Sequence, residues 1–258
     1  KPLTVAAIDA GSNAIRVIVA HALPEGLTTL TAERVAVRLG KGTFTTGSLS
    51  PQTIDVAVAA FIRFRQLFDE HSVDVYRAVA TSALRSANNR EQLLDRIYRE
   101  AGIALEVIDG MEESRLVRKA VLSRFPDRRP PAAIADLGGG SLEVVTRKNG
   151  DWIGSSVKIG TVRLLETFGL KGAINEDEQR MIQRFIRSTL RGGLPRSVLN
   201  SKLKSAAGCG GNFEALAELF GERSKSGVLQ LPLDALKANL SSVLRSDVKE
   251  RMSRFKVR

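Results

Sequence analysis

The feature that most constrains the fold of this chain is an acidic, glycine-containing turn that occurs twice. "AAIDAGSNAIRVIVA" spans residues 6–20, and "ADLGGGSLEVV" spans residues 135–145. In both stretches an apolar run leads into Asp-x-Gly, and a second apolar run follows the turn. Internal similarity of this kind predicts two related halves, each with a strand, an acidic turn and a returning strand. A chance match between two short motifs is the alternative.

The two copies carry opposite charges at one equivalent position. When Asp9 is placed over Asp136, Arg16 falls over Glu143, seven residues after the Asp in each copy. Two such hairpins facing each other across a cleft would hold a phosphate from both sides. Arg16 would contact phosphate oxygens, and Glu143 would meet a metal or its water. We therefore expect both side chains to point into the same cleft.

The three consecutive glycines of the second copy predict an anion site. Glycine lacks a Cβ and permits positive φ, so Gly138, Gly139 and Gly140 allow backbone N–H groups to approach a ligand closely. Asp136 cannot hold a phosphate because both are negative, but it can hold a cation that holds the phosphate. The alternative is a tight β-hairpin whose Asp and Ser only satisfy the turn.

Strands alternate with helices along the chain, which predicts an α/β protein with helices layered on a mixed sheet. Ser50 before Pro51 predicts the start of a helix, and Asn149-Gly150 predicts a hairpin turn. "PDRRPP" at 126–131 predicts a loop near a domain boundary. We expect strands at 3–9, 13–20, 33–39, 75–80, 104–108, 132–136, 142–148, 152–158 and 203–207, and helices at 51–70, 89–101, 111–125, 161–168, 176–191, 212–220 and 232–255.

The charge balance favours an anionic partner. The chain of 258 residues has a net charge of +11 and a sequence pI of about 10.2, which suits nucleic acid, a membrane surface or a polyanionic substrate. Only 5% of the residues are aromatic and none is interleaved in a basic stripe, so base stacking on single strands is disfavoured. Basic residues cluster at 124–129 and 245–258. A soluble protein from a basic proteome is the alternative explanation.

Several kinds of site are excluded by residue counts. Cys209 is the single cysteine, so no intrachain disulfide exists, which fits a reducing cytoplasm. With only His21 and His71 besides, the sequence contains no zinc constellation and no obvious Cys-His or Ser-His-Asp site. No apolar run approaches the ~18 residues of a membrane span, and no signal peptide is visible, although the sequence starts at Lys1 rather than Met.

Four motifs occur in a recognisable order. They are "DAGSN" at 9–13, "TSALRSANN" at 81–89, "VIDGMEESRL" at 107–116 and "ADLGGGSLEVV" at 135–145. Together they resemble the exopolyphosphatase / guanosine pentaphosphate phosphohydrolase (Ppx/GppA) family, of the actin-like ATPase superfamily, over nearly the whole chain. The resemblance implies two actin-like (ribonuclease H-like) domains with mixed sheets flanked by helices, at 1–117 and 118–258, and an active site in the interdomain cleft. It also implies a cytoplasmic homodimer that uses Mg²⁺.

The resemblance also implies roles for individual residues. Glu113 corresponds to the catalytic base, and Arg16 and Arg85 to arginines that contact phosphate. Asp136 and Glu143 correspond to acids near the metal, and Asp9, in the first phosphate turn, is grouped with them. The expected phosphate cradle consists of Ser12, Asn13, Gly138, Gly139, Gly140 and Ser141.

One turn departs from the family pattern. "AAGCGGNFEAL" at 206–216 stands where many relatives carry Gly-Gly-Thr-x-Thr-Thr, so the threonine hydroxyls are missing. The turn remains glycine-rich and opens a helix, and we still expect Gly208 and Gly210 to contact an anion. Cys209 fits a small buried filler better than a nucleophile. Relatives also continue beyond the point where this sequence ends, so its C-terminal end is expected to be incomplete.

The expected activity is removal of the terminal phosphate from inorganic polyphosphate. The first alternative is hydrolysis of guanosine pentaphosphate to the tetraphosphate, which would connect the protein to the stringent response. A kinase or ATPase would need an adenosine pocket, and the altered turn at 206–212 disfavours it. A non-catalytic sensor of polyanions or nucleotides is the alternative of another class; the combination of Glu113, Asp136, Glu143 and Arg16 argues against it.

Overall fold

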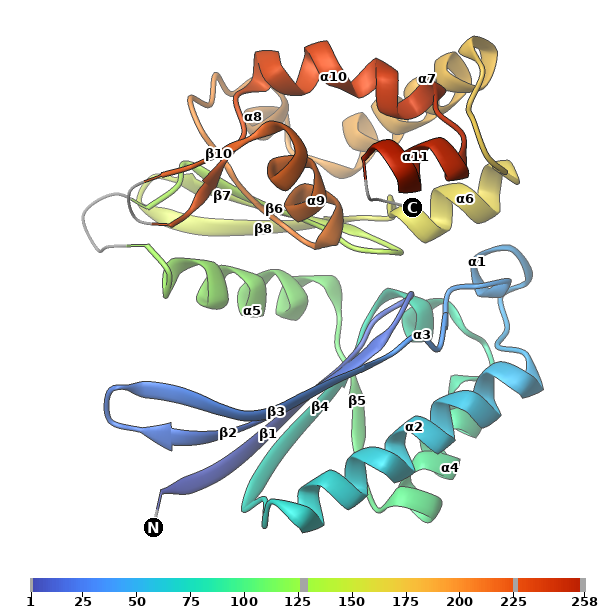
Figure 1. The fold of residues 1–258 in the computed structure, drawn as a ribbon, viewed down its shortest axis with the longest axis vertical. Helices are drawn as coiled ribbons and strands as arrows, with labels where there is room; N and C mark the ends of the chain where they lie inside the picture. Colours follow the sequence, from blue (N-terminus) through green and yellow to red (C-terminus); the bar gives the residue numbers. More distant parts are fainter. Residues whose placement is uncertain (1, 126–129, 225–226, 256–258) are drawn as a thin grey trace. The chain divides into compact units, whose positions relative to one another are not determined.

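The computed structural model describes residues 2–125, 130–224 and 227–255. It divides the chain into two compact units, unit 1 (Lys1–Glu113) and unit 2 (Ser114–Arg258). The predicted α/β class with mixed sheets flanked by helices is confirmed (Figure 1). Part of the predicted loop at 126–131 and parts of both basic clusters, 126–129 and 256–258, lie outside the described residues.

Unit 1 is built on a five-stranded sheet in the order β3-β2-β1-β4-β5. The central strand β1 runs antiparallel to β2 and parallel to β4. Helices α2 and α4 pack together on one face of this sheet (Figure 1). The elements are β1 (Leu3–Ala10), β2 (Ile15–Leu23), β3 (Gly26–Val35), α1 (Thr43–Thr46), α2 (Pro51–Glu70), β4 (Val75–Ala80), α3 (Ser82–Ser86), α4 (Arg90–Ala101), β5 (Leu105–Val107) and the start of α5 (Gly110–Leu122).

Helix α2 begins and packs as its sequence predicts. Ser50 is the N-cap, and its hydroxyl oxygen accepts a hydrogen bond of 3.1 Å from the backbone N–H of Thr53. Pro51 occupies the first turn, where its missing N–H costs nothing. The apolar stripe of the helix, which includes Phe61 and Phe64, is fully buried in the core of unit 1.

Unit 2 is built on a four-stranded sheet in the order β8-β7-β6-β9. Asn149 and Gly150 both have positive φ, which confirms the predicted tight turn between β7 and β8. The elements after α5 are β6 (Ala133–Leu137), β7 (Leu142–Lys148), β8 (Asp151–Val157), α6 (Thr161–Phe168), α7 (Glu176–Gly193), α8 (Arg196–Leu199), β9 (Ala207–Cys209), α9 (Gly211–Phe220), β10 (Glu222–Arg223), β11 (Leu229–Gln230), α10 (Leu233–Arg245) and α11 (Val248–Arg254).

The two sheets repeat one arrangement, which confirms the predicted internal similarity. In unit 1, Asp9 on β1 lies directly opposite Arg16 on the antiparallel strand β2. In unit 2, Asp136 on β6 lies directly opposite Glu143 on the antiparallel strand β7. A parallel strand flanks the other side of each Asp-bearing strand, β4 in unit 1 and β9 in unit 2.

Three predicted elements were placed wrongly. The strand expected at 33–39 is β3, which begins at Gly26 and ends at Val35. It ends there because Arg38 and Gly40 bond the first turn instead of the sheet. The strand expected at 203–207 is β9, which begins at Ala207, where pairing with β6 starts. The helix expected at 232–255 is interrupted at Ser246, because Asp247 begins α11 with a capping box.

We predict that Phe64→Ala lowers the free energy of unfolding of unit 1 by about 3–5 kcal/mol, because the ring is fully buried and its loss leaves a cavity. Ile62→Ala on the same helix is the control, since Ile62 is partly exposed. Urea titration followed by far-UV circular dichroism measures the loss, and Trp152 fluorescence reports unit 2 separately. Equal losses in the two variants would contradict the assignment of the core.

Candidate active site

The first turn is closed by a short hydrogen bond and pinned by a neighbouring segment. The N–H of Gly11 donates to the carbonyl oxygen of Ala14 at 3.1 Å. The carbonyl oxygen of Ser12 accepts from the N–H of Gly40 at 2.7 Å, and that of Asn13 accepts from Arg38 at 3.0 Å. Both carbonyls of the predicted cradle residues are therefore directed to the 38–40 segment, which holds the turn in one conformation.

The second turn is closed in the same way and is pinned by the start of α6. The N–H of Gly138 donates to the carbonyl oxygen of Ser141 at 3.0 Å. The carbonyl oxygens of Gly138 and Gly139 accept from the backbone N–H groups of Thr161 and Arg163, at 3.1 and 2.9 Å. The Arg163 Nε donates to the carbonyl oxygen of Gly140 at 2.8 Å. All three glycine carbonyls are thus engaged from one side.

Each turn has two consecutive backbone N–H groups that donate no hydrogen bond within the described residues. Within the described ranges, no hydrogen bond uses the backbone N–H of Ser12 or Asn13, or that of Gly139 or Gly140. The two pairs occupy equivalent positions of the repeat, because Gly11 corresponds to Gly138. Consecutive N–H groups in a tight turn form a concavity that binds anions. The predicted cradle residues thus leave one pair of unbonded N–H groups in each unit; Asn13 and Gly139 have exposed surface, whereas Ser12 and Gly140 are buried.

Asp136 and Glu143 form a cross-strand pair of carboxylates in unit 2. Directly opposite residues of antiparallel strands project from the same face of the sheet, with Cβ atoms about 5 Å apart. Glu143 is 1% exposed, and Ser156 Oγ donates to its Oε1 at 2.8 Å. Two like charges placed opposite each other repel unless a cation lies between them.

This donor set fits a magnesium ion. Mg²⁺ prefers oxygen ligands, keeps several waters and is commonly held by one or two carboxylates together with substrate phosphates. Asp136 and Glu143 would supply the protein ligands. No group of three or more His, Cys, Asp or Glu in the described part of the chain lies close enough to hold a metal by side chains alone. The assignment of Asp9 as a third metal ligand stays a prediction.

In unit 1 the equivalent pair has opposite charges. The Arg16 Nη1 lies 3.7 Å from the Asp9 Oδ2, and each side chain exposes about half of its surface. Desolvation raises the pKa of the Asp9 carboxyl above its ordinary value, and attraction to Arg16 opposes this shift. Arg16 is therefore attached loosely at a solvent-accessible position. Its expected approach to phosphate, from the same cleft as Glu143, stays a prediction.

The structure brings Arg85 and Glu113 together within unit 1. The Arg85 Nη1 donates to the Glu113 Oε2 at 2.8 Å and to the backbone carbonyl oxygen of Ile108, also at 2.8 Å. Both side chains are largely buried. Arg85 therefore orients the expected base, which is a role that sequence analysis did not assign to it. Its expected contact with phosphate stays a prediction.

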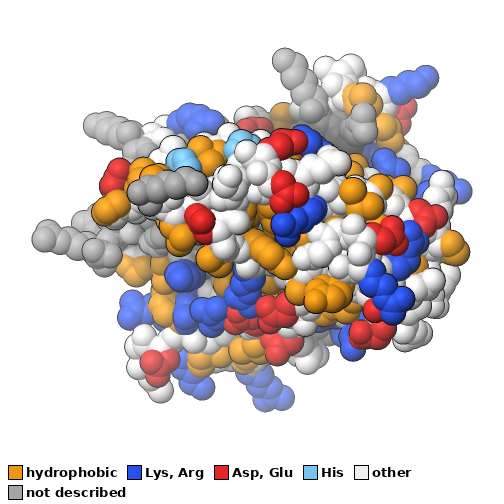
Figure 2. Space-filling model, turned by 90° about the horizontal axis from the view of Figure 1, so that it is seen from below, with side chains coloured by type: hydrophobic (Ala, Val, Ile, Leu, Met, Phe, Trp, Pro, Cys, Tyr) orange, Lys and Arg blue, Asp and Glu red, His pale blue; other side chains and the backbone are white. Residues whose placement is uncertain are grey.

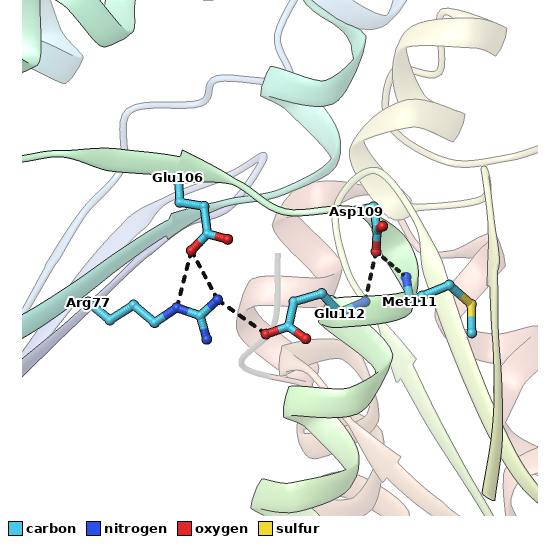
Figure 3. A network of polar contacts seen from close by, with 5 residues as sticks. All are labelled: Arg77, Glu106, Asp109, Met111 and Glu112. Carbon is cyan, nitrogen blue, oxygen red and sulfur yellow. Dashed lines mark hydrogen bonds and ion pairs between the residues drawn. The ribbon is translucent and has the colours of Figure 1, made fainter.

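A second arginine, Arg77 on β4, also holds the start of α5 (Figure 3). The Arg77 Nη2 bridges Glu106 on β5 and Glu112 on α5, at 3.0 and 3.1 Å. The Asp109 Oδ1 accepts from the backbone N–H groups of Met111 and Glu112, at 2.9 and 2.8 Å. The first turn of α5 is thus fixed to β4 and β5, and Glu113 follows directly from it.

The altered third turn lies against the second turn, within unit 2. Cys209 on β9 is the register partner of Asp136. Gly210 has φ +91°, and a Cβ there would lie 2.7 Å from the carbonyl oxygen of Leu137. Gly208 is packed against Phe213. Desolvation, and then the Asp136 charge, raises the pKa of the Cys209 thiol to about 11, so it is protonated at neutral pH and unsuited to be a nucleophile.

Sequence analysis missed the residues that support these groups. No local motif marks Arg77, Ser156 or Arg163. Each of them bonds a residue of another helix, strand or turn, so its role could not be predicted from neighbouring sequence. Gly160 could have been noticed in the sequence, because a glycine between a predicted strand and a predicted helix often allows close packing. A Cβ there would overlap the backbone of Gly139 and Gly140, so only glycine allows α6 to approach the second turn this closely.

Comparison with known proteins gives consistent results. The sequence matches the Ppx/GppA phosphatase family over residues 15–255. "Exopolyphosphatase 2" of Mycobacterium tuberculosis is 32% identical over 224 residues, which cover 83% of this chain and 70% of that protein. "Exopolyphosphatase 1" of Mycobacterium leprae is 31% identical over 138 residues, which cover 53% of this chain and 41% of that protein.

Solved structures show the same architecture. A crystal structure of an exopolyphosphatase from Cytophaga hutchinsonii has a TM-score of 0.86 at 28% identity, with 98% of this chain and 84% of that chain covered. The Aquifex aeolicus member of the Ppx/GppA family has a TM-score of 0.77 at 27% identity, with 99% and 83% covered. The fold and the paired turns thus define an α/β phosphatase with the actin-like fold. The chain belongs to the Ppx/GppA phosphatase family.

In the part of the chain that the structure describes, no helix is both long enough and apolar enough to cross a membrane.

We predict that Gly160→Ala lowers kcat/KM for phosphate release by about 10²-fold, because the new methyl group displaces the second turn and small displacements at a site cost this much. Gly192→Ala is the matched control, since a Cβ there meets nothing within 4 Å. Steady-state phosphate release, with circular dichroism to confirm folding, measures both. Equal activity in the two variants would show that α6 does not set the turn.

Proposed function

We propose that this protein is an exopolyphosphatase, which releases the terminal orthophosphate from inorganic polyphosphate by hydrolysis. The observation that carries the proposal is the pair of equivalent turns, each with two consecutive N–H donors available and an Asp on the strand that precedes it. Membership of a phosphatase family and the activity of the named relatives support the substrate class.

In the proposed mechanism each turn binds and orients phosphate oxygens of the substrate. The N–H groups of Gly139 and Gly140 donate in unit 2, and those of Ser12 and Asn13 donate in unit 1. Arg16 adds a guanidinium, whose planar fork suits phosphate oxygens. Phosphoryl transfer depends mainly on positioning and on stabilising charge, so fixed backbone donors account for much of the expected rate.

Glu113 serves as the general base. It accepts a proton from the attacking water as the water oxygen bonds to the terminal phosphorus. The bond from that phosphorus to the bridging oxygen breaks, and orthophosphate leaves from a chain shortened by one unit. Arg85 keeps the Glu113 carboxylate oriented through the 2.8 Å ion pair. A positioned base of this kind contributes about 10²- to 10⁴-fold to the rate.

We propose that Mg²⁺ is the cofactor and that Asp136 and Glu143 hold it. The ion would neutralise charge on the phosphate oxygens. Ser156 fixes one oxygen of Glu143 through its hydroxyl group, so the direction of this ligand is set by the protein before any ion binds. Such support of a ligand by a neighbouring side chain commonly tunes affinity for the metal.

Guanosine pentaphosphate is the second candidate substrate, and it would make the protein part of the stringent response. The loss of threonines from the 206–212 turn favours polyphosphate over a nucleotide, because hydroxyl groups that could contact a nucleoside are missing. We also propose that the protein acts as a homodimer in the cytoplasm. A polyanion sensor without catalysis would not need the oriented Glu113.

The direct test compares substrates for the wild-type protein and for Glu113→Gln. We predict that long polyphosphate releases phosphate with a higher kcat/KM than guanosine pentaphosphate or ATP. Glu113→Gln is expected to lower kcat by about 10²- to 10⁴-fold. Glu25→Gln, an exposed acid in the turn between β2 and β3, is the control and is expected to lose much less. A folded Glu113→Gln protein with near-normal turnover would exclude the base assignment, and no release from polyphosphate would refute the function.

Removing either cross-strand carboxylate is expected to raise the Mg²⁺ concentration needed for half-maximal activity. The expected change for Asp136→Asn or Glu143→Gln is about 10-fold or more, the range found when metal sites lose supporting groups. Asp151→Asn, an exposed acid on β8, is the control. Isothermal titration of Mg²⁺ gives the same comparison without turnover. Unchanged titrations for both carboxylate variants would remove the metal role.

A further inference from the structure

The net positive charge of the chain comes from unit 2. Residues 1–113 contain 12 of the 39 Lys and Arg residues and 14 of the 28 Asp and Glu residues. Residues 114–258 therefore contain 27 basic residues against 14 acidic ones. Basic and acidic side chains are interspersed on the face of the molecule drawn in Figure 2. The net charge of +11 thus describes one unit and not the surface as a whole.

One segment of unit 2 has no negative charge. Residues 179–213 include no Asp or Glu, and the segment runs from α7 to the turn after β9. Its seven basic residues are Arg180, Arg184, Arg187, Arg191, Arg196, Lys202 and Lys204, and all seven are exposed.

The arginines of α7 lie on one face of that helix. Positions 184, 187 and 191 are three and four residues apart, so their side chains project from neighbouring turns of the same face. Residues 184 and 191 are separated by about 10 Å along the axis, from the helical rise. The stripe therefore presents several guanidinium groups in a row, as an extended polyanion requires.

These arginines form no ion pairs within the described residues, whereas many arginines of unit 1 do. Within the described residues, the side chains of Arg184, Arg187 and Arg191 have no hydrogen bond or ion pair. The acids at the start of α7, Glu176 and Asp177, pair instead with Arg180. In unit 1, by contrast, an ion pair with Asp or Glu is formed by Arg63, Arg65, Arg77, Arg85, Arg90, Arg96 and Arg99.

The basic segment leads to the second phosphate turn. Gly193, at the end of α7, packs against Val157 at the end of β8, which is one edge of the sheet. The chain then continues through Arg196, Lys202 and Lys204 to β9, at the other edge. There Cys209 pairs with Asp136. A chain bound at the glycine turn could therefore continue onto basic groups of the same unit.

We propose that the stripe formed by Arg184, Arg187 and Arg191 on α7 is a docking surface for the distal part of a long inorganic polyphosphate chain. This inference depends on the proposed function for its substrate class. A short substrate would occupy only the turns, whereas a long chain would also reach the stripe. Polyphosphate suits the segment better than single-stranded nucleic acid, because both of its aromatic rings are packed, Phe185 on Phe168 and Phe213 on Gly208, and cannot stack on bases.

The test uses the triple variant Arg184→Gln, Arg187→Gln, Arg191→Gln in the full chain. The control triple, Arg65→Gln, Arg90→Gln, Arg99→Gln, removes the same charge from unit 1. Binding of end-labelled long polyphosphate and of tripolyphosphate is measured by fluorescence anisotropy and competition, in EDTA, at several salt concentrations. Circular dichroism checks that both triples are folded.

We expect the α7 triple to weaken binding of long polyphosphate roughly 10-fold, as three exposed charge contacts allow. The slope of log Kd against log salt should fall by about 2, because three fewer phosphates are neutralised and each releases roughly 0.7 of a counterion. The effect on tripolyphosphate and the effect of the control triple should both be much smaller. Equal losses for long and short chains, or for the two triples, would overturn the proposal. So would stronger displacement of the label by single-stranded RNA than by unlabelled polyphosphate of similar length.

Failure of the docking surface and failure of the proposed function give different results. If long polyphosphate is hydrolysed and the two triples bind it equally, the function stands and the docking surface is refuted. If the α7 triple alone loses affinity for long polyphosphate but the wild-type protein releases no phosphate, the docking surface stands and the function is refuted.

Discussion

The hydrogen bond that closes each Asp-x-Gly turn is the constraint on which the site depends. In one unit Gly11 donates to Ala14, and in the other Gly138 donates to Ser141. Once this bond forms, the two residues between its ends cannot pair within the turn, so their N–H groups remain available. Neighbouring segments then engage the carbonyl oxygens of Ser12 and Asn13 in one turn and of all three glycines in the other, whereas the N–H groups stay unbonded. This is the polarity that an anion requires.

The charged groups around the turns follow from the same pairing. Because the strands are antiparallel, the residue seven positions after each Asp returns to lie beside it. In unit 2 that residue is Glu143, and two adjacent carboxylates favour a cation. In unit 1 it is Arg16, which offers a guanidinium to phosphate instead. A duplicated hairpin with one exchanged charge can thus supply both a metal site and a direct anion contact.

The sequence correctly predicted those helices and turns that are determined by neighbouring residues. Ser50-Pro51 marked the start of α2, and Asn149-Gly150 marked a hairpin, because capping and turn chemistry involve neighbouring residues. The repeated Asp-x-Gly motif also predicted the common register of both hairpins. Less predictable were β3, whose first residues are exposed, and β9, which is short and depends on pairing with β6. The packing of Gly160 on the second turn and the pairing of Arg85 with Glu113 are tertiary contacts without a local motif.

The central claim is that Ser12 and Asn13 in unit 1, and their counterparts Gly139 and Gly140 in unit 2, bind phosphate groups. The most direct measurement is an ¹⁵N–¹H correlation spectrum of the labelled protein titrated with tripolyphosphate. The account predicts that the amide resonances of all four residues shift, whereas the amide of Gly150, in the tight turn between β7 and β8, does not. Unchanged amide resonances in either phosphate turn would contradict it.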